Sequence, residues 1–264
     1  MSSRQGLLGE LGANSTAEEL GRTLRRDGYA VLTDMVGQDL LIDLAAAAQS
    51  KLADRAAQVA DGGRDFTAKA FWVRLLDSEM RDGRMPSDSI FVRFALQPAL
   101  VQTLSEAMGG LPQLDYVLLT LSQHSAEPLA QSQLWHRDYD DPRTIKVFVY
   151  LTDVTSIEDG PFTFLPARAT DRCGSSLRSH RSDADIFSHV APEEKVEIIA
   201  PKLSVFAVET SRCLHMGSRL APGHERLLYT ATFTSFPKLA PAPSQFALTG
   251  QETEIERAIL VPES

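Results

Sequence analysis

The second half of the chain is a succession of short runs rich in β-branched and aromatic residues, and this pattern limits the fold more than any other feature. Turn residues separate the runs, as at Asp159, Gly160 and Pro161. The predicted strands cover residues 116–121, 145–151, 162–165, 196–199, 204–208 and 227–233. Many short strands between turns are typical of an antiparallel sandwich or barrel.

The first half is mainly helical in character. A capping-box spacing at Ser15 predicts a helix that ends at Asp27-Gly28, and a short strand over residues 29–32 follows it. An Ala- and Leu-rich run over residues 38–60 and a second run over 98–108 are each followed by two glycines, which predicts two further helices. Residues 71–76 and 90–94 each read as a strand or as part of a cavity wall.

Helices followed by strands predict an α+β fold, mainly β, in one domain. With 264 residues, of which 43% are hydrophobic, the chain can bury one sizeable core. We expect a flexible lead-in over 1–14, a helical buttress and cavity wall over 15–114, a β core over 115–236 and a C-terminal tail over 237–264. The polar stretch 167–192 interrupts the strands, and a lid is the natural interpretation of so long a loop.

Charge and cysteine content narrow the classes of partner. The formal net charge is −9, which argues against nucleic acid or an anionic membrane as the main partner. The two cysteines, Cys173 and Cys213, lie far apart and read as free thiols in a reducing cytosol. We find no signal peptide and no apolar run long enough to cross a bilayer, so a cytoplasmic protein is expected.

The chemistry is concentrated in residues 134–140, where His136 and Asp138 stand two positions apart. If this segment is a strand, both side chains point to one face. A His-x-Asp pair on a strand supplies two of the three ligands in the facial triad that binds non-haem Fe(II). By itself the pair is a weak signal, because side chains of these types are common in proteins without a metal.

The third ligand should lie on a later strand that returns to the same mouth of the barrel. His215 follows the predicted 204–208 strand directly, and we choose it over the remaining histidines. Arg226 begins the last strand after the turn at Ala221-Pro222-Gly223. Its guanidinium can bind a carboxylate through two parallel hydrogen bonds, or it can pair with a structural Asp or Glu.

The order His136-x-Asp138, His215, Arg226 resembles the Fe(II)/2-oxoglutarate-dependent dioxygenases of the phytanoyl-CoA dioxygenase (PhyH-like) family. The opening helix that ends in Asp27-Gly28-Tyr29 and the turn at Gly160 are also similar to theirs, so the resemblance covers roughly residues 15–236. It implies a double-stranded β-helix (jelly-roll, cupin-like) core buttressed by the N-terminal helices. It also implies Fe(II) bound by the triad, 2-oxoglutarate paired with Arg226, and O2 as the oxidant.

The resemblance further implies a hydroxylase that releases succinate and CO2. The carboxylate of Asp138 favours oxygen transfer over halogenation, since related halogenases carry a small residue there. Desaturation, epimerisation or ring formation would use the same site. Two alternatives come from other classes: a jelly-roll binding or sensor module without turnover, and a zinc or manganese cupin-like hydrolase or isomerase that needs no keto acid.

Several further residues are candidates for the co-substrate or the substrate, each with an ordinary structural alternative. Gln123 and Ser218 could hydrogen-bond 2-oxoglutarate, or be solvated amide and hydroxyl groups. Substrate contacts are predicted, against packing or surface roles, for Arg137, Tyr139, Arg143, Trp72 and Arg93. The basic residues of the polar loop indicate a small-molecule substrate with an anionic group, or simply a solvated lid; they are Arg168, Arg172, Arg178 and Arg181.

Overall fold

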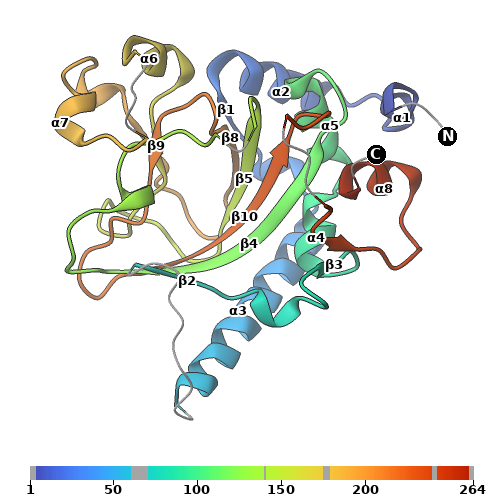
Figure 1. Cartoon of the computed structure of the whole chain (residues 1–264), viewed down its shortest axis with the longest axis horizontal. Coiled ribbons are helices and arrows are strands. Elements are labelled where there is room, and N and C mark those ends of the chain that lie inside the picture. The colour runs from blue at the N-terminus through green and yellow to red at the C-terminus, as the bar shows by residue number, and fades with distance from the viewer. Residues whose placement is uncertain (1–3, 61–70, 140, 175–178, 240–242, 262–264) are drawn as a thin grey trace.

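Two antiparallel sheets face each other at the centre of the molecule (Figure 1). The computed structural model describes residues 4–60, 71–139, 141–174, 179–239 and 243–261. The large sheet has the strand order β1-β8-β5-β10-β4-β2, and the small sheet has the order β7-β6-β9. A separate parallel pair joins β11 to β3.

Most strands follow the runs predicted from the sequence, with β4 and β10 longer than expected, whereas the two-residue strands β3, β9 and β11 lie outside those runs. The strands are β1 Tyr29–Val31, β2 Trp72–Arg74, β3 Met85–Pro86, β4 Gln113–Gln123, β5 Thr144–Tyr150, β6 Thr163–Phe164, β7 Val196–Glu197, β8 Val205–Glu209, β9 His215–Met216, β10 Glu225–Thr234 and β11 Phe246–Ala247. The helices are α1 Arg4–Glu10, α2 Ser15–Asp27, α3 Gln38–Ala60, α4 Ile90–Ala95, α5 Pro98–Met108, α6 Ala167–Arg172, α7 Asp183–Ile186 and α8 Glu254–Leu260.

The large sheet is buried on both faces, which explains why its central strands read as nearly continuous apolar runs. On β5, Val147 and Val149 belong to the core under the helices, whereas Phe148 and Tyr150 pack between the two sheets. Successive side chains of a strand point to opposite faces. The alternation therefore assigns the even-numbered positions of β5 to the space between the sheets.

Helices α3, α4 and α5 cover the outer face of the large sheet, and β9, α6 and α7 lie on its other side (Figure 1). The core beneath the helices includes Tyr229 of β10, whose hydroxyl donates to the carbonyl of Phe91 in α4 at 2.5 Å. None of the helices within the described residues combines the length and apolar character needed to cross a membrane. The predicted α+β class with N-terminal helices behind a β core is confirmed.

Two segments of the first half have helical structure that was not predicted. Residues 90–95 form helix α4 rather than a strand, because Phe91, Val92 and Phe94 are buried on a helical turn beneath β10. A short apolar run does not distinguish a buried strand from a buried helix. Residues 4–10, expected in a flexible lead-in, form α1; Arg4 fixes this helix by donating to the carbonyls of Leu111 and Pro112 at 3.0 and 3.1 Å.

Gly28 joins α2 to β1 at a point where no side chain fits. Its φ of +85° lies in the left-handed region, and a Cβ there would come within 2.4 Å of the Cys213 sulfur. Cys213 is fully buried two residues before His215. The close approach therefore packs the first helix–strand connection against the segment that carries the proposed third ligand.

Gly28→Ala should lower the free energy of unfolding by about 2–5 kcal/mol, since left-handed strain costs about 1–2 kcal/mol and overpacking a core about 1–3. Gly83→Ala is the matched control, because Gly83 has a φ of +74° but no atom within 4 Å of the new Cβ. Urea unfolding followed by circular dichroism measures both. Equal losses in the two variants would show that the Cys213 contact contributes nothing.

Candidate metal site and cavity

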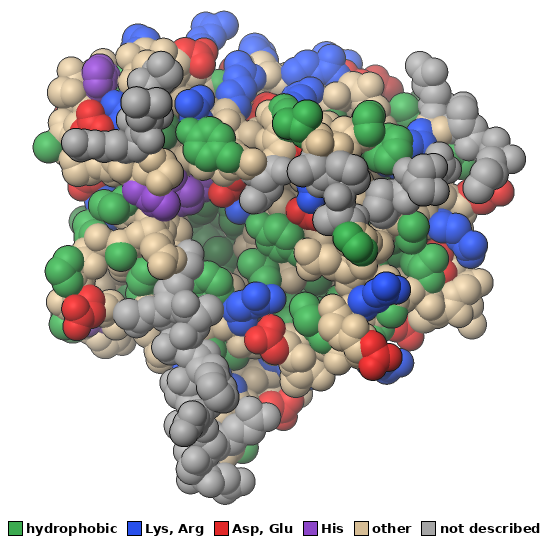
Figure 2. Space-filling view, in the orientation of Figure 1, with side chains coloured by type: hydrophobic (Ala, Val, Ile, Leu, Met, Phe, Trp, Pro, Cys, Tyr) green, Lys and Arg blue, Asp and Glu red, His purple; other side chains and the backbone are tan. Residues whose placement is uncertain are grey.

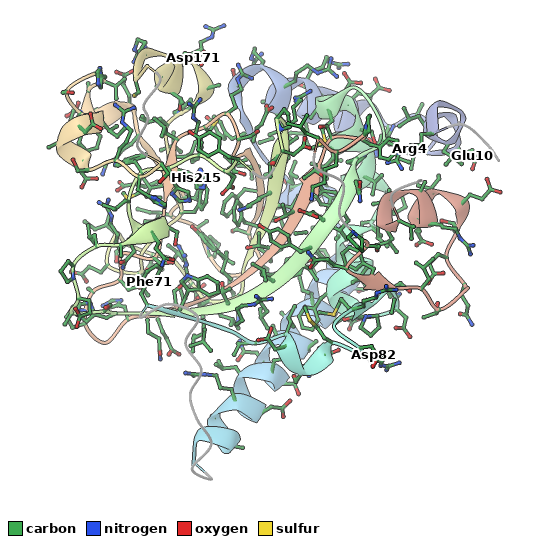
Figure 3. The ribbon with its side chains drawn as sticks, viewed as in Figure 1. Arg4, Glu10, Phe71, Asp82, Asp171 and His215 are labelled. Carbon is green, nitrogen blue, oxygen red and sulfur yellow. The ribbon has the colours of Figure 1, made fainter. Side chains whose placement is uncertain are left out.

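Three potential metal ligands converge between the two sheets. His136 and Asp138 follow a short 3-10 turn, and His215 begins β9 on the small sheet (Figure 3). Donor atoms of the three side chains all lie within 4.8 Å of one another. The Nε2 atom of His215 is 3.8 Å from Oδ2 of Asp138, and the two imidazole rings lie 4.2 Å apart. The structure thus brings together the three residues that the sequence predicted as ligands.

The segment carrying His136 and Asp138 is not the regular strand that was expected over residues 134–140. It pairs with several partners in turn: Trp135 forms a bridge with Arg181, and His136 forms one with His215. The Asp138 N–H then donates to the carbonyl of Thr210 at 3.0 Å. A segment that changes partner at each residue builds no continuous ladder, although it remains extended; Asp140 lies outside the described residues.

Backbone carbonyls fix both imidazole rings in the same way. Nδ1 of His136 lies 2.8 Å from the carbonyl oxygen of Leu134, and Nδ1 of His215 lies 3.0 Å from that of Cys213. When Nδ1 donates to a carbonyl, Nε2 is left as the unprotonated nitrogen. This arrangement orients the ring and leaves Nε2 as the metal donor.

The charge states suit a divalent cation. Burial, reinforced by His215, lowers the pKa of His136 to about 3, and burial also lowers the pKa of His215. Burial alone would raise the pKa of Asp138, but His215 and Lys146 outweigh it and hold that pKa below its usual range. Both imidazoles are therefore neutral and the carboxylate is ionised at neutral pH, which metal binding requires. The Oδ2 atom of Asp138 is buried, and its nearest cation is the Nζ atom of Lys146 at 2.8 Å.

The three residues line one end of a cavity of about 310 Å³ that separates the sheets. On the face shown in Figure 2, the surface is hollowed beside a group of histidine side chains. Besides Asp138, the lining contains two charged residues, Lys146 and Arg226. The remaining lining is apolar or weakly polar and includes Trp72, Tyr116, Leu118, Thr120, Ser122, Phe148, Phe162, Met216, Ser218, Leu228 and Thr230.

Arg226 lies at one end of the cavity and is 2% exposed. Its guanidinium donates to the hydroxyl of Ser218 at 3.0 Å and to the carbonyl of Gly160, and its Nε has no partner. Among the described residues, no carboxylate forms an ion pair with it. Burial lowers the pKa of Arg226, with Tyr150 opposing the shift. A buried guanidinium without a protein anion favours binding of an anionic ligand.

The residues predicted beside Arg226 are only partly placed there. Ser218 lines the cavity, and its hydroxyl also lies 3.0 Å from that of Ser122. Gln123 does not line it, because side chains alternate along β4 and its neighbour Ser122 faces inward. Only the register of β4 against β10, which pairs Ser122 with Arg226, reveals this difference of one position.

Of the five predicted substrate residues, only Trp72 lines the cavity. Tyr139 is 66% exposed, and Arg137 lies near its ring rather than in the cavity lining. Arg143 is used structurally: it pairs with Glu209 at 3.1 Å and donates to the carbonyls at the end of α5. Arg93 is an exposed residue on α4.

Lys146 is the charged residue of this site that was not predicted from the sequence. It lies on β5 with its Nζ 2.8 Å from Oδ2 of Asp138 and 6.0 Å from the centre of the Tyr116 ring. Burial opposes its charge, but Tyr116 and Asp138 outweigh this effect and raise the pKa of Lys146. The signal in the sequence is one cation inside an apolar β-branched run, at the same parity as Phe148 and Tyr150.

The described part of the polar stretch 167–192 is anchored to residues 134–139, the segment that carries His136 and Asp138 and is called the metal segment below. Asp183 of α7 accepts the indole N–H of Trp135 at 2.7 Å and pairs with Arg219. Arg181, predicted to face a substrate, is buried and pairs instead with Asp185 at 2.7 Å. Arg168 and Arg172 are exposed, and Arg178 lies outside the described residues. The ion pair with Asp185 accounts for the burial of Arg181 without a substrate.

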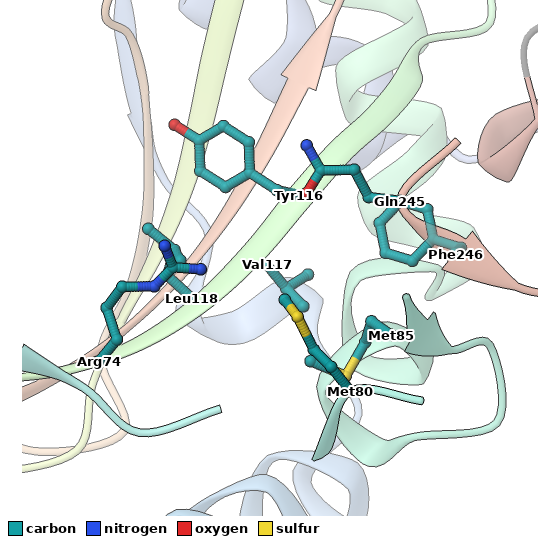
Figure 4. A pocket seen from close by; sticks show the side chains of 8 residues that line it. All are labelled: Arg74, Met80, Met85, Tyr116, Val117, Leu118, Gln245 and Phe246. Atoms are coloured by element: carbon teal, nitrogen blue, oxygen red, sulfur yellow. The ribbon is translucent and has the colours of Figure 1, made fainter. Parts of the chain in front are cut away.

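A second pocket of about 210 Å³ borders the first and shares Tyr116 and Leu118 with it. Figure 4 shows its wall, in which Met80, Met85 and Phe246 face β4 and Arg74 approaches from β2. It opens where β2 has ended, since β2 pairs with β4 only at residues 120–122. The pocket is therefore next to the Tyr116 end of the cavity.

Comparison with solved structures identifies the fold. EctD from S. alaskensis, in its apo form, aligns with a TM-score of 0.57 and 17% identity over 95% of this chain and 84% of its own. The epimerase SnoN from nogalamycin biosynthesis, in complex with Fe3+, alpha ketoglutarate and nogalamycin RO, aligns with a TM-score of 0.55 and 16% identity over 83% of each chain. The carbocyclase SnoK aligns with a TM-score of 0.55 and 18% identity over 84% of this chain and 87% of its own.

The chain has a double-stranded β-helix fold. This confirms the predicted jelly-roll core with N-terminal helices around it. No family model matches the chain, and no match is found among curated proteins. At these identities the likeness concerns the fold, so the activity has to be argued from the site itself.

Proposed function

We propose that this protein is a non-haem Fe(II)- and 2-oxoglutarate-dependent oxygenase that hydroxylates a small organic molecule and releases succinate and CO2. The observation that carries the proposal is the position of two features in one cavity. Two neutral imidazoles and an ionised carboxylate meet at one place, and a buried arginine without a carboxylate partner lies at another. A dicarboxylic keto acid that chelates a metal needs both features.

In this proposal His136, Asp138 and His215 hold the iron. Their donor set is the two-histidine, one-carboxylate triad that suits Fe(II) and leaves coordination positions for the keto acid and O2. Arg226 and Ser218 bind the distal carboxylate of 2-oxoglutarate. Gln133 supports them by donating to the carbonyl of Ser218 at 3.0 Å.

Iron with bound 2-oxoglutarate supplies oxidative decarboxylation of the keto acid and an oxidant for a substrate C–H bond. The chain's own contribution is to orient and enclose the reactants. Backbone carbonyls hold the imidazoles, and Phe148, Phe162 and Leu228 form an apolar wall that excludes water. The depressed pKa of Asp138 keeps the ligand ionised.

The size of the cavity supports a small substrate. A volume of about 310 Å³ is at the lower end of the range for ligand pockets, which is roughly 300–1,000 Å³, and 2-oxoglutarate takes a share of it. A larger substrate would extend into the neighbouring pocket past Leu118 and Tyr116. The Met and Phe side chains of that pocket suit an apolar extension.

The reaction outcome has alternatives within the same site. SnoN is an epimerase and SnoK a carbocyclase, and both share the fold of this chain. Epimerisation, ring formation and desaturation would use the same iron ligands and the same keto acid. Hydroxylation is the simplest outcome, because it needs no second substrate group beside the iron.

Substrate-free turnover tests the proposal. Protein supplied with Fe(II), ascorbate and 2-oxoglutarate should slowly form succinate, and His136→Ala should abolish it because one of three ligands is lost. Absence of succinate with every compound in a substrate screen would favour a binding or sensor module. Metal-dependent activity that survives Arg226→Ala would favour a hydrolase or isomerase.

A further inference from the structure

Lys146 and Arg226 are the two cationic side chains of the described cavity lining, and they project from different register positions of the large sheet. On β10, Arg226 pairs with Ser122 of β4, whereas Thr232 pairs with both Tyr116 of β4 and Lys146 of β5. These backbone positions are six residues apart along β10, or roughly 20 Å at about 3.3 Å per residue, and the side chains of Lys146 and Arg226 extend into the cavity from them. The apolar residues Leu118, Phe148 and Leu228 line the cavity between them.

The anion that Lys146 contacts is also the carboxylate proposed to bind iron. Lys146 Nζ is 2.8 Å from Oδ2 of Asp138, and this is the oxygen that faces Nε2 of His215 at 3.8 Å. An ammonium ion and a divalent metal then share one buried carboxylate. The single negative charge of the carboxylate does not neutralise both cations, and a buried cation without a counter-charge is costly.

The formal charges of the cavity lining show that one negative charge is missing. Asp138, Lys146 and Arg226 are the only acidic or basic side chains of the described lining besides His136 and His215, and an imidazole that binds a metal is neutral. With a divalent metal the site carries three positive charges in excess. The 2-oxoglutarate dianion neutralises two of them, and one positive charge remains at the Lys146 end.

We propose that Lys146 binds a single negatively charged group on the substrate, so that the substrate is a small monoanionic molecule such as a carboxylic acid. The proposal rests on the proposed function, because the charge count includes the metal and the keto acid. Lys146 and Tyr116 contribute ammonium and phenol groups to the cavity from one register level of the sheet, six residues along β10 from the level of Arg226. The substrate anion restores charge neutrality and replaces Asp138 as the partner of the lysine.

The experiment compares acids with amides of the same shape. Wild-type protein is loaded with Ni(II) and saturating 2-oxoglutarate, and linear monocarboxylates from acetate to octanoate are titrated beside their primary amides. Binding is detected by saturation-transfer NMR and quantified by calorimetry. At least one acid should bind about tenfold or more tightly than its amide, as expected for a buried charge pair.

Two variants of Lys146 and one control variant test whether the positive charge of this lysine is responsible for acid binding. Lys146→Met should weaken acid binding about tenfold or more, and Lys146→Arg should keep most of it, because it retains the charge. Lys195→Met should leave acid binding unchanged, since Lys195 pairs with Glu197 outside the cavity lining. The proposal is overturned if no acid exceeds its amide in affinity or if Lys146→Met binds acids as the wild type does.

The affinity of Lys146→Met for Ni(II) is a second measurement, and it also shows whether the variant has folded, because the metal site forms only in the folded chain. Because the ammonium and the metal share Asp138, Lys146→Met should bind Ni(II) at least as tightly as wild type. Weaker Ni(II) binding in a folded variant would make Lys146 a positioning residue for Asp138 and overturn the proposal. A wild-type protein that binds neither Ni(II) nor 2-oxoglutarate would instead refute the proposed function.

Discussion

His215→Ala is expected to lower the affinity for Ni(II) or Co(II) by at least about a hundredfold and to abolish succinate formation. Mutating a residue that merely orients a metal ligand typically costs about 10–100-fold in affinity, so the loss of a ligand should cost more. His215 is the proposed ligand of the small sheet, and among the described residues no histidine besides His136 and His215 joins the group of potential ligands. Calorimetric titration of the metal-free protein measures the effect.

His189→Ala is the matched control. His189 is exposed, and its Nε2 lies 3.9 Å from Asp185 on α7, away from the cavity. Because His215 is buried, His136→Ala is prepared beside it as a variant at a more accessible ligand. Retention of wild-type metal affinity in both ligand variants would show that the metal binds elsewhere.

Arg226→Met should reduce the affinity for 2-oxoglutarate roughly thirtyfold or more while leaving the metal affinity unchanged. Truncating one partner of a buried charge pair costs about 2–5 kcal/mol, and about 1.4 kcal/mol corresponds to a factor of ten. Methionine fills most of the space of the arginine stem, and an apolar replacement for a buried charge is often tolerated by the fold. Calorimetry of the Ni(II)-loaded protein with 2-oxoglutarate provides the measurement.

Arg226→Lys should recover part of the binding, since lysine keeps the charge but not the two parallel hydrogen bonds. Arg172→Met serves as the control, because Arg172 lies on the exposed face of α6 and pairs with Glu194. Unchanged 2-oxoglutarate binding in Arg226→Met would remove the main support for a keto-acid co-substrate. The hydrolase or isomerase alternative would then be preferred.

Much of the fold could be predicted because the relevant signals are local. The start signals of α2 and α5, the glycines that end them and the β-branched runs of β5 and β10 each indicate an element from neighbouring residues, although α2 is capped by Asn14 rather than by the predicted Ser15 and α5 begins at Pro98 without a side-chain cap. Helix α4 could not be predicted in this way. Its Phe91 and Phe94 suit a strand as well as a helix, and packing against Tyr229 decides between them.

The residues of the candidate site also fall into those that local sequence patterns predict and those that they do not. His136, Asp138 and His215 were found from their order and spacing. Lys146 and Ser122 were not, because the role of each depends on which side of a strand faces the cavity. That parity is set by pairing with β10, more than eighty residues away in the sequence. Long-range register is absent from local sequence patterns.

The changing partners of the metal segment also bear on how the protein folds. The backbone of His136 is held by His215, that of Trp135 by Arg181 and that of Asp138 by Thr210, so every backbone anchor is distant in sequence. Closing such loops is costly in entropy, and the ligands can meet only after both sheets have formed. A metal that binds only the folded chain would add about 4 kcal/mol of stability at a thousandfold excess over its dissociation constant. Thermal denaturation of this protein should therefore depend on metal concentration.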